Sequence, residues 1–131
     1  MYEELSSADA FTSPLSWTDS TFSLNPYDLV FLPGGHEKSI RQIIEDVKVQ
    51  EHLANYVPET RKPGRKSLAA ICHGVQVLSA ASNGEGKSVI HDLETTALPS
   101  RMEGLAFWGT RMMLGDYVGR YAVPDARSRV D

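Results

Sequence analysis

The clearest indication of the fold comes from two stretches, YDLVFLPGG at residues 27–35 and SLAAICHG at residues 67–74. Each begins with a short apolar run that does not alternate with polar residues. Such a run predicts a strand covered on both faces, as in a parallel sheet. The runs stop abruptly, the first at Pro33-Gly34-Gly35 and the second at Cys72-His73-Gly74. We therefore predict buried strands at 27–32 and 67–71, each followed by a tight turn.

Helical spacing of apolar residues follows each predicted strand. After the first come Ile40, Ile43, Ile44 and Val47, with Leu53, Tyr56 and Val57 beyond. A second helical stretch is expected at 75–81 and a short third strand at 88–91. A further helix, capped by Thr95 or Thr96, would contain Leu98, Met102, Leu105, Met112 and Met113. Strands that alternate with helices in this way indicate an α/β fold.

Chemically reactive side chains stand at the ends of the three predicted strands. Gly34-Gly35-His36 follows the first strand, Cys72-His73 the second, and His91 ends the third. Ligands of open α/β sheets bind outside the carboxyl ends of the strands. We therefore expect the functional site at this edge.

Cys72 stands at the turn between a buried strand and a helix, where α/β hydrolases carry their nucleophile. The positive end of the following helix would favour the thiolate, and a neighbouring imidazole could assist. The backbone amides of His73 and Gly35 could stabilise an oxyanion. The alternative is a buried structural cysteine, because free cysteine is among the most buried residue types.

Composition limits the remaining choices. The chain has 131 residues, 41% of them hydrophobic, which suits a single domain with a core. Its net charge of −4 argues against nucleic acid or an anionic membrane as the main partner. We find neither an apolar run of membrane-spanning length nor a signal peptide at the start. A single cysteine forms no internal disulfide, which indicates a reducing compartment, and we expect a cytoplasmic protein.

Four features of the sequence imitate sites that we do not expect. The turn at 84–88 resembles the end of a phosphate-binding loop but precedes a predicted strand instead of following one. His36-Glu37 begins like a zinc-protease helix, yet Ile40 stands where the second histidine belongs, and no metal is expected. The basic loop 61–66 and His52 are interpreted as solvated surface.

The two motifs LPGGH, residues 32–36, and AAICHG, residues 69–74, together resemble the ThiJ/PfpI superfamily, which has a class I glutamine amidotransferase-like fold. The segments 27–31 and 86–99 also resemble members of this group, and the similarity extends over about residues 2–121. The resemblance implies a three-layer, flavodoxin-like parallel sheet with helices on both faces. It divides the chain into an N-terminal arm (1–26), the α/β domain (27–121) and a polar tail (122–131).

The resemblance also implies roles for individual residues. Cys72 would be the elbow nucleophile, the amides of His73 and Gly35 would form the oxyanion site, and His91 would lie near the thiol. We also expect substrate contacts from Gly34, His36 and Trp108, although Trp108 could instead belong to the core or to a dimer contact. The chemistries of the superfamily include hydration of 2-oxoaldehydes as in glyoxalase III, isocyanide hydration, amide or peptide hydrolysis and protein protection. As a rule they need no cofactor, and members are usually dimers or higher oligomers.

The chain departs from the superfamily at both ends. The usual N-terminal strand–helix–strand unit, whose helix carries a glutamate that contacts the cysteine, does not precede residue 27. Glu3 and Glu4 are weak substitutes for that glutamate, and Met1 resembles an internal methionine of a longer relative. The similarity fades after Asp116-Tyr117, before the usual last strands and helix. Without the first unit, the edge of strand 27–32 would be unpaired, so we expect a homo-oligomer that shields it.

These observations support two functional hypotheses. The first is a cysteine-dependent hydrolase or hydro-lyase that acts on a small carbonyl compound or related electrophile. The second is a shortened relative without catalysis that serves as an interaction or oxidation-sensing module through Cys72. A true amidotransferase is disfavoured, because His91 is followed by Asp92-Leu93-Glu94 and not by a glutamate two positions later.

Overall fold

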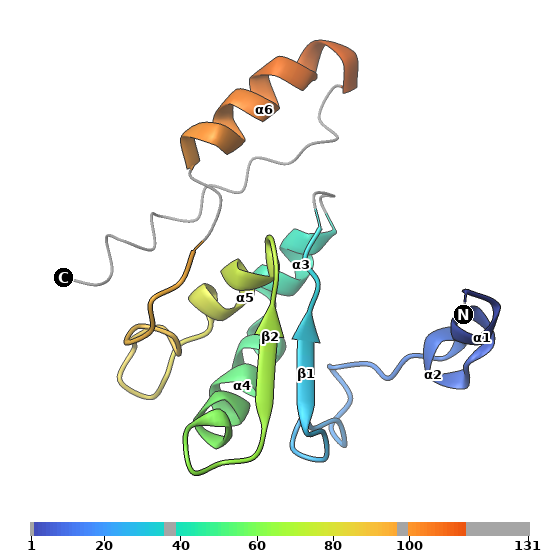
Figure 1. Cartoon of the computed structure of the whole chain (residues 1–131), viewed down its shortest axis with the longest axis vertical. Coiled ribbons are helices and arrows are strands. Elements are labelled where there is room, and N and C mark those ends of the chain that lie inside the picture. Colours follow the sequence, from blue (N-terminus) through green and yellow to red (C-terminus); the bar gives the residue numbers. More distant parts are fainter. Residues whose placement is uncertain (1, 36–38, 97–99, 115–131) are drawn as a thin grey trace.

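The computed structural model describes residues 2–35, 39–96 and 100–114. A two-stranded parallel sheet lies at its centre, with helices packed behind it (Figure 1). In chain order the elements are α1 (Tyr2–Ser7), α2 (Asp9–Thr12), β1 (Leu29–Leu32), α3 (Ile40–Glu45), α4 (Val47–Tyr56), the 3-10 helix η1 (Val57–Thr60), β2 (Ser67–Ala70), α5 (Gly74–Ala80) and α6 (Ser100–Leu114). The α/β pattern predicted from the sequence is therefore confirmed.

The two predicted strands pair with each other in parallel. Leu29 lies opposite Ser67, and Leu32 lies opposite Ala70. Because the strands run in the same direction, the turns that follow them meet at one edge of the sheet. Tyr56 secures the opposite end: its buried hydroxyl lies 3.0 Å from the Tyr27 carbonyl and 3.2 Å from the Ser67 carbonyl. Burial, with a smaller contribution from nearby Asp28, raises the pKa of Tyr56, so the hydroxyl stays protonated and can donate.

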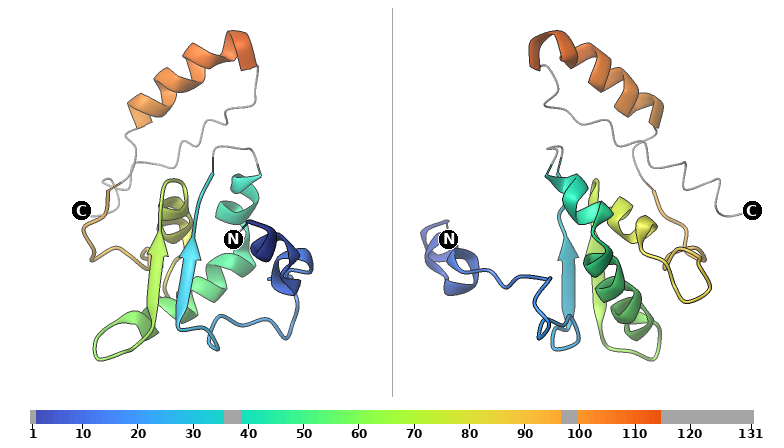
Figure 2. Two further views of the ribbon diagram at one scale, coloured as in Figure 1. Left: turned by 45° about the vertical axis from the view of Figure 1, so that its right-hand side comes forward. Right: turned by 180° about the vertical axis from the view of Figure 1, so that it is seen from behind.

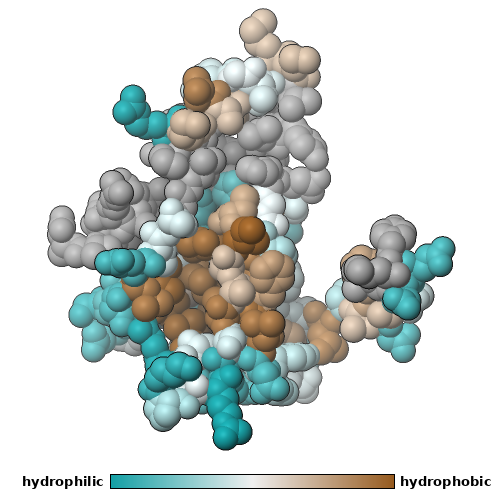
Figure 3. All heavy atoms as spheres, in the orientation of Figure 1, coloured by the Kyte–Doolittle hydropathy of each residue, from teal (hydrophilic) through white to brown (hydrophobic). Residues whose placement is uncertain are grey.

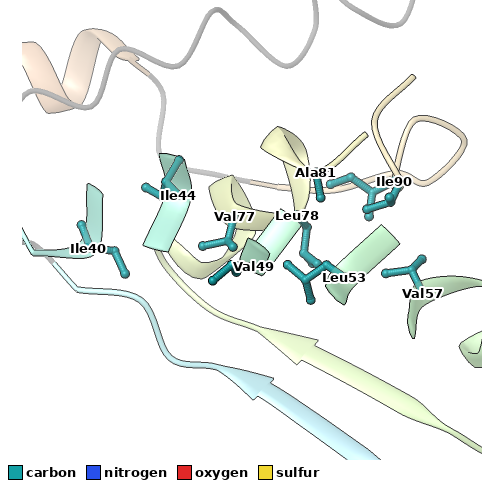
Figure 4. Packing of buried hydrophobic residues seen from close by; sticks show 10 residues of the cluster. Ile40, Ile44, Val49, Leu53, Val57, Val77, Leu78, Ala81 and Ile90 are labelled. Carbon is teal, nitrogen blue, oxygen red and sulfur yellow. The ribbon is translucent and has the colours of Figure 1, made fainter. Parts of the chain in front are cut away.

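The core lies between one face of the sheet and the helices α3, α4 and α5, which all cover that face (Figure 2). Leu53 and Val77 are each only 1% exposed, and Figure 4 shows them among the aliphatic side chains of these helices. From the strands, Leu32, Leu68 and Ala70 pack against this cluster. The apolar residues whose spacing predicted the helices are therefore the residues that fill the core.

The described residues show only part of the expected sheet. The strands alternate between half-buried and exposed side chains, so one face of the sheet is covered, and the described residues do not show a three-layer arrangement. The predicted third strand at 88–91 is a turn: Ser88 makes an isolated antiparallel bridge with Ser82, and the His91 amide donates to the Ser88 carbonyl at 3.0 Å. A short apolar run cannot by itself distinguish a strand from a buried turn.

The stretch 40–57, which the periodicity predicts as one helical stretch, is divided at Asp46. This residue has extended backbone, and its side chain accepts hydrogen bonds from the amides of Lys48 and Val49 at the start of α4. It also accepts one from the Trp17 indole at 3.1 Å, and this bond is the main reason that the pKa of Asp46 is lowered. An N-cap of this kind begins a new helix.

The arm before β1 contacts α4 through its later residues. The Phe22 ring meets the His52 ring edge-on, and His52 Nε2 lies 3.0 Å from the Trp17 carbonyl. His52 is therefore partly exposed and also contacts the arm, which the sequence did not predict. The predicted polar tail, residues 122–131, lies outside the described residues. No helix in the described part of the chain is long and apolar enough to span a membrane.

Candidate functional site

Cys72 occupies the turn between β2 and α5 with a backbone φ of +56°. This left-handed conformation is uncommon for residues other than glycine and costs about 1–3 kcal/mol. The turn is closed on both sides of the cysteine: the Gly74 amide donates to the Ile71 carbonyl at 2.9 Å, and the Val75 amide donates to the Cys72 carbonyl at 3.2 Å. A strained turn from strand to helix is the backbone geometry of a nucleophile elbow.

Two glycines allow the turns that follow β1 and β2 to touch. A Cβ on Gly34 would lie 2.7 Å from both the Ile71 oxygen and the Gly74 nitrogen, and 2.9 Å from the His73 nitrogen. Gly34 also has a φ of +72°. On the other side of the contact, a Cβ on Gly74 would overlap the Leu32 carbonyl. Glycine is required at both positions because any side chain would separate the two turns.

The thiol of Cys72 is exposed, whereas the neighbouring imidazole is buried. Cys72 Sγ lies 3.5 Å from His73 Nδ1, and His73 is 4% exposed. The alternative of a buried structural cysteine is therefore wrong. The predicted role of His73 was a backbone amide, but its ring also lies within reach of the sulfur and can exchange a proton with it.

The two amides predicted to stabilise an oxyanion belong to turns that meet. The close approach of Gly34 to the His73 nitrogen brings the turn carrying Gly35 beside the elbow. A Cβ added to Gly35 would find no atom of the described residues within 4 Å, so this glycine borders open space. An incoming carbonyl group could therefore approach from the side of Gly35.

His91 lies in the turn that replaces the predicted third strand. Its Nδ1 is 2.8 Å from the Ser88 carbonyl, a contact that requires a proton on Nδ1 because a carbonyl oxygen only accepts. In the neutral ring, Nε2 then keeps its lone pair and can act as a base. The geometry thus fixes a tautomer suited to proton transfer, whereas the expected proximity of His91 to the thiol stays a prediction.

Asp92, next to His91, forms a two-pronged ion pair with Arg61. The guanidinium nitrogens lie 2.9 and 2.6 Å from the two carboxylate oxygens. These hydrogen bonds from Arg61 lower the pKa of Asp92. From the sequence we interpreted Arg61 as part of a solvated loop. No local pattern indicates a partner such as Asp92, which lies 31 residues away. The pair joins the loop before β2 to the turn that carries His91.

The other predicted site residues are not assembled around the thiol in the described residues. Trp108 is 60% exposed on α6, where its ring contacts Phe107 and the Arg111 guanidinium. Helix α6 stands apart from the sheet (Figures 1 and 2). His36 lies outside the described residues. Glu3 and Glu4 are exposed on α1, which also stands apart from the sheet. Within the described ranges, no group of three or more His, Cys, Asp or Glu side chains could hold a metal ion.

Comparisons with known proteins identify a family for the chain but no similar solved structure. The family model described as ThiJ/PfpI family-like matches residues 1–129. An uncharacterized protein of Schizosaccharomyces pombe is 34% identical over 90 residues, which cover 67% of this chain and 34% of that protein. A second uncharacterized protein of the same yeast is 23% identical over 107 residues, which cover 79% of this chain and 35% of that protein. The chain thus spans about a third of the length of these curated relatives. No solved structure matches it significantly.

Proposed function

We propose that this chain, which belongs to the ThiJ/PfpI-like family, is a cysteine-dependent hydrolase or hydro-lyase that acts on a small carbonyl compound or related electrophile. Family membership, predicted from the motifs at 32–36 and 69–74, is confirmed by the match over residues 1–129. The observation that carries the proposed chemistry is the exposed Cys72 thiol in a left-handed turn, 3.5 Å from His73 Nδ1.

The first proposed step is addition of the thiolate to the carbonyl carbon. A carbon–sulfur bond forms, and the π electron pair of the carbonyl group moves to its oxygen. The amides of His73 and Gly35 would donate hydrogen bonds to the resulting oxyanion. Donors that are already in position stabilise negative charge as it develops. The thiol proton would first pass to an imidazole. The His73 ring lies within reach of the sulfur and could accept this proton.

The second proposed step releases the product by attack of water. With an amide or ester, the tetrahedral adduct expels its leaving group, which takes up a proton, and water then hydrolyses the thioester. With a 2-oxoaldehyde, the net reaction adds one water and moves the aldehyde hydrogen to the adjacent carbonyl carbon, which gives a 2-hydroxy acid. His91, whose Nε2 keeps its lone pair in this tautomer, is the proposed proton carrier. Neither route consumes an oxidant or a cofactor.

The decisive experiment compares turnover of methylglyoxal, and of a panel of small esters and amides, by the wild type and by Cys72→Ser. Both proteins should unfold at similar temperatures, because the exposed sulfur contributes little to packing. We expect Cys72→Ser to lose activity at least about 100-fold, since the alcohol is a far weaker nucleophile than a thiolate. Unchanged turnover in the variant would rule out the proposed chemistry.

The two histidines can be separated by the same assay. We expect His91→Asn to lower kcat about 10- to 100-fold, the range of a single proton-transfer group. His73→Asn removes the imidazole ring but keeps the backbone amide, so it tests the ring alone. His52→Asn is the control, because His52 contacts the arm. Loss of activity in the His52 control alone would contradict these assignments.

The exposure of Cys72 also favours the second candidate, an oxidation-sensing module. An accessible thiol can be oxidised to a sulfenic acid, a reversible change. A reducing compartment such as the cytoplasm, which we propose as the location, would restore it. Rapid modification of Cys72 by dilute peroxide, together with no turnover of any carbonyl compound, would select this candidate over the enzyme.

A further inference from the structure

The sheet presents an uncovered apolar face. This open face consists of Leu29, Phe31, Ala69 and Ile71, the residues whose side chains point away from α3, α4 and α5. Leu29, Phe31 and Ile71 are each nearly 60% exposed. In Figure 3 the hydrophobic surface gathers over β1 and β2. Parallel sheets normally bury both faces, and an exposed apolar patch of this kind usually marks a binding surface.

Helix α6 presents a second uncovered apolar surface. Its apolar face consists of Met102, Leu105, Trp108, Met112 and Met113, which lie within an arc of about 140° at 3.6 residues per turn. Met112 is 97% exposed and Met113 is 89% exposed. Methionine side chains are flexible and fit irregular apolar surfaces well. The helix therefore carries the kind of surface that covers a sheet.

Charge neither drives nor opposes a contact between these two surfaces. Helix α6 contains Arg101 and Arg111 against the single acidic residue Glu103. Residues 27–96, which include the sheet and its helices, carry nine acidic and eight basic side chains. The apolar surfaces are therefore the reason for the docking.

We propose that the open face is covered by α6 of a second copy of this chain, and that the exchange is reciprocal. A 15-residue helix is about 22 Å long, and a four-residue strand about 13 Å, so one such contact is small. Two contacts related by a two-fold axis double the area and approach the ~800 Å² per partner of a stable interface. The second helical layer that the sequence predicts would then come from the partner.

This dimer differs in its location from the one expected from the sequence. That expectation placed the partner at the edge of β1, whereas the open face lies at right angles to the edge. Ile71 directly precedes Cys72, so the docked helix would border the thiol and could bring the partner's Trp108 to the substrate. This last consequence rests on the proposed function; the contact itself does not.

The test is the mass of the full chain in solution at micromolar concentration, measured by light scattering. We expect a dimer of the 14.5-kDa chain for the wild type. Two double variants, Leu29→Thr with Phe31→Thr on the sheet and Leu105→Gln with Met112→Gln on the helix, should each be monomers. All four side chains are more than half exposed, and the replacements suit strand and helix respectively. Val47→Thr is the control, because Val47 is 63% exposed but lies outside both faces.

Each other result would overturn the proposal and identify the alternative. A monomeric wild type would indicate that α6 covers its own sheet or that neither face is used. Dissociation by only the sheet variant would indicate sheet-to-sheet pairing, and dissociation by only the helix variant helix-to-helix pairing.

Disulfide trapping provides a measurement that does not depend on stability. In a Cys72→Ser background, one sample of chain carries Phe31→Cys and another carries Leu105→Cys. Oxidation of the mixture should yield covalent dimers that contain one chain of each kind. Dimers of like chains only, or no dimers, would contradict docking of the helix on the partner's sheet. Activity does not enter either assay, so failure here leaves the proposed function unaffected.

Discussion

The packed side and the open side of the sheet differ in what their residues tolerate. On the packed side, Leu32, Leu68 and Ala70 pack against the core under the helices, and Gly34 lies against the elbow turn. On the open side, Leu29 and Phe31 extend into solvent; at Gly35, a Cβ would meet no atom of the described residues within 4 Å. Residues of the same type occur on both sides. Position relative to the helices, and not residue type, therefore determines which substitutions each residue tolerates.

The adjacent glycines give the sharpest contrast. We expect Gly34→Ala to lower the free energy of unfolding by about 3 kcal/mol or more, because the methyl group meets three backbone atoms and φ is positive. Gly35→Ala should change it by less than about 0.5 kcal/mol. Urea unfolding of both variants measures the difference; equal effects would mean that the two turns do not touch.

Two leucines compare the packed core with the open face: Leu53 of α4 lies in the core, and Leu29 of β1 lies on the open face. Leu53→Ala should cost about 2–5 kcal/mol, since Leu53 is 1% exposed and its removal leaves a cavity. Leu29→Ala, at 59% exposure, should cost under about 1 kcal/mol in the monomer. Thermal unfolding at low protein concentration avoids any contribution from association. A larger effect at Leu29 than at Leu53 would reverse the assignment of packed and open sides.

Tyr56→Phe tests the end of the sheet far from the elbow. The variant keeps the buried ring but leaves the Tyr27 and Ser67 carbonyls without their donor. We expect a loss of about 1–2 kcal/mol in the free energy of unfolding. Amide exchange at the first residues of β1 and β2 should accelerate more than at the elbow. The control is Tyr27→Phe, whose side chain is 45% exposed.

Cys72 lies where the packed and open sides meet, and its backbone strain can be measured. Cys72→Gly should be about 1 kcal/mol more stable than Cys72→Ala, because glycine adopts a φ of +56° without strain. Neither variant carries a nucleophile, so the comparison reports the backbone alone. If the alanine variant is the more stable one, the turn is not held in the left-handed conformation.

The smallest expected effect belongs to the exposed pair Arg61–Asp92. Because the pKa of Asp92 is lowered in the folded protein, its contribution to stability is present above the ordinary pKa of an aspartate and is lost as the pH falls through the lowered value. Asp92→Asn should therefore unfold slightly earlier than the wild type at pH 7 and at the same point in strong acid. A difference that persists in strong acid would assign the effect to something other than this ionisation.

Residue patterns alone predicted the two strands, the turns after them, the family and the placement of Cys72 between strand and helix. The local sequence was sufficient there, because a short apolar run predicts a strand and the glycine that follows predicts its end. The three-dimensional structure was needed to show that residues 88–90 form a bridged turn, that His73 places its ring beside the sulfur, and that Arg61 pairs with Asp92. It also decided that one face of the sheet is open and that α6 stands apart with its apolar face exposed. The physical reason is that burial and long-range pairing depend on which surfaces meet in three dimensions, and the hydrophobicity of a run does not specify its partner.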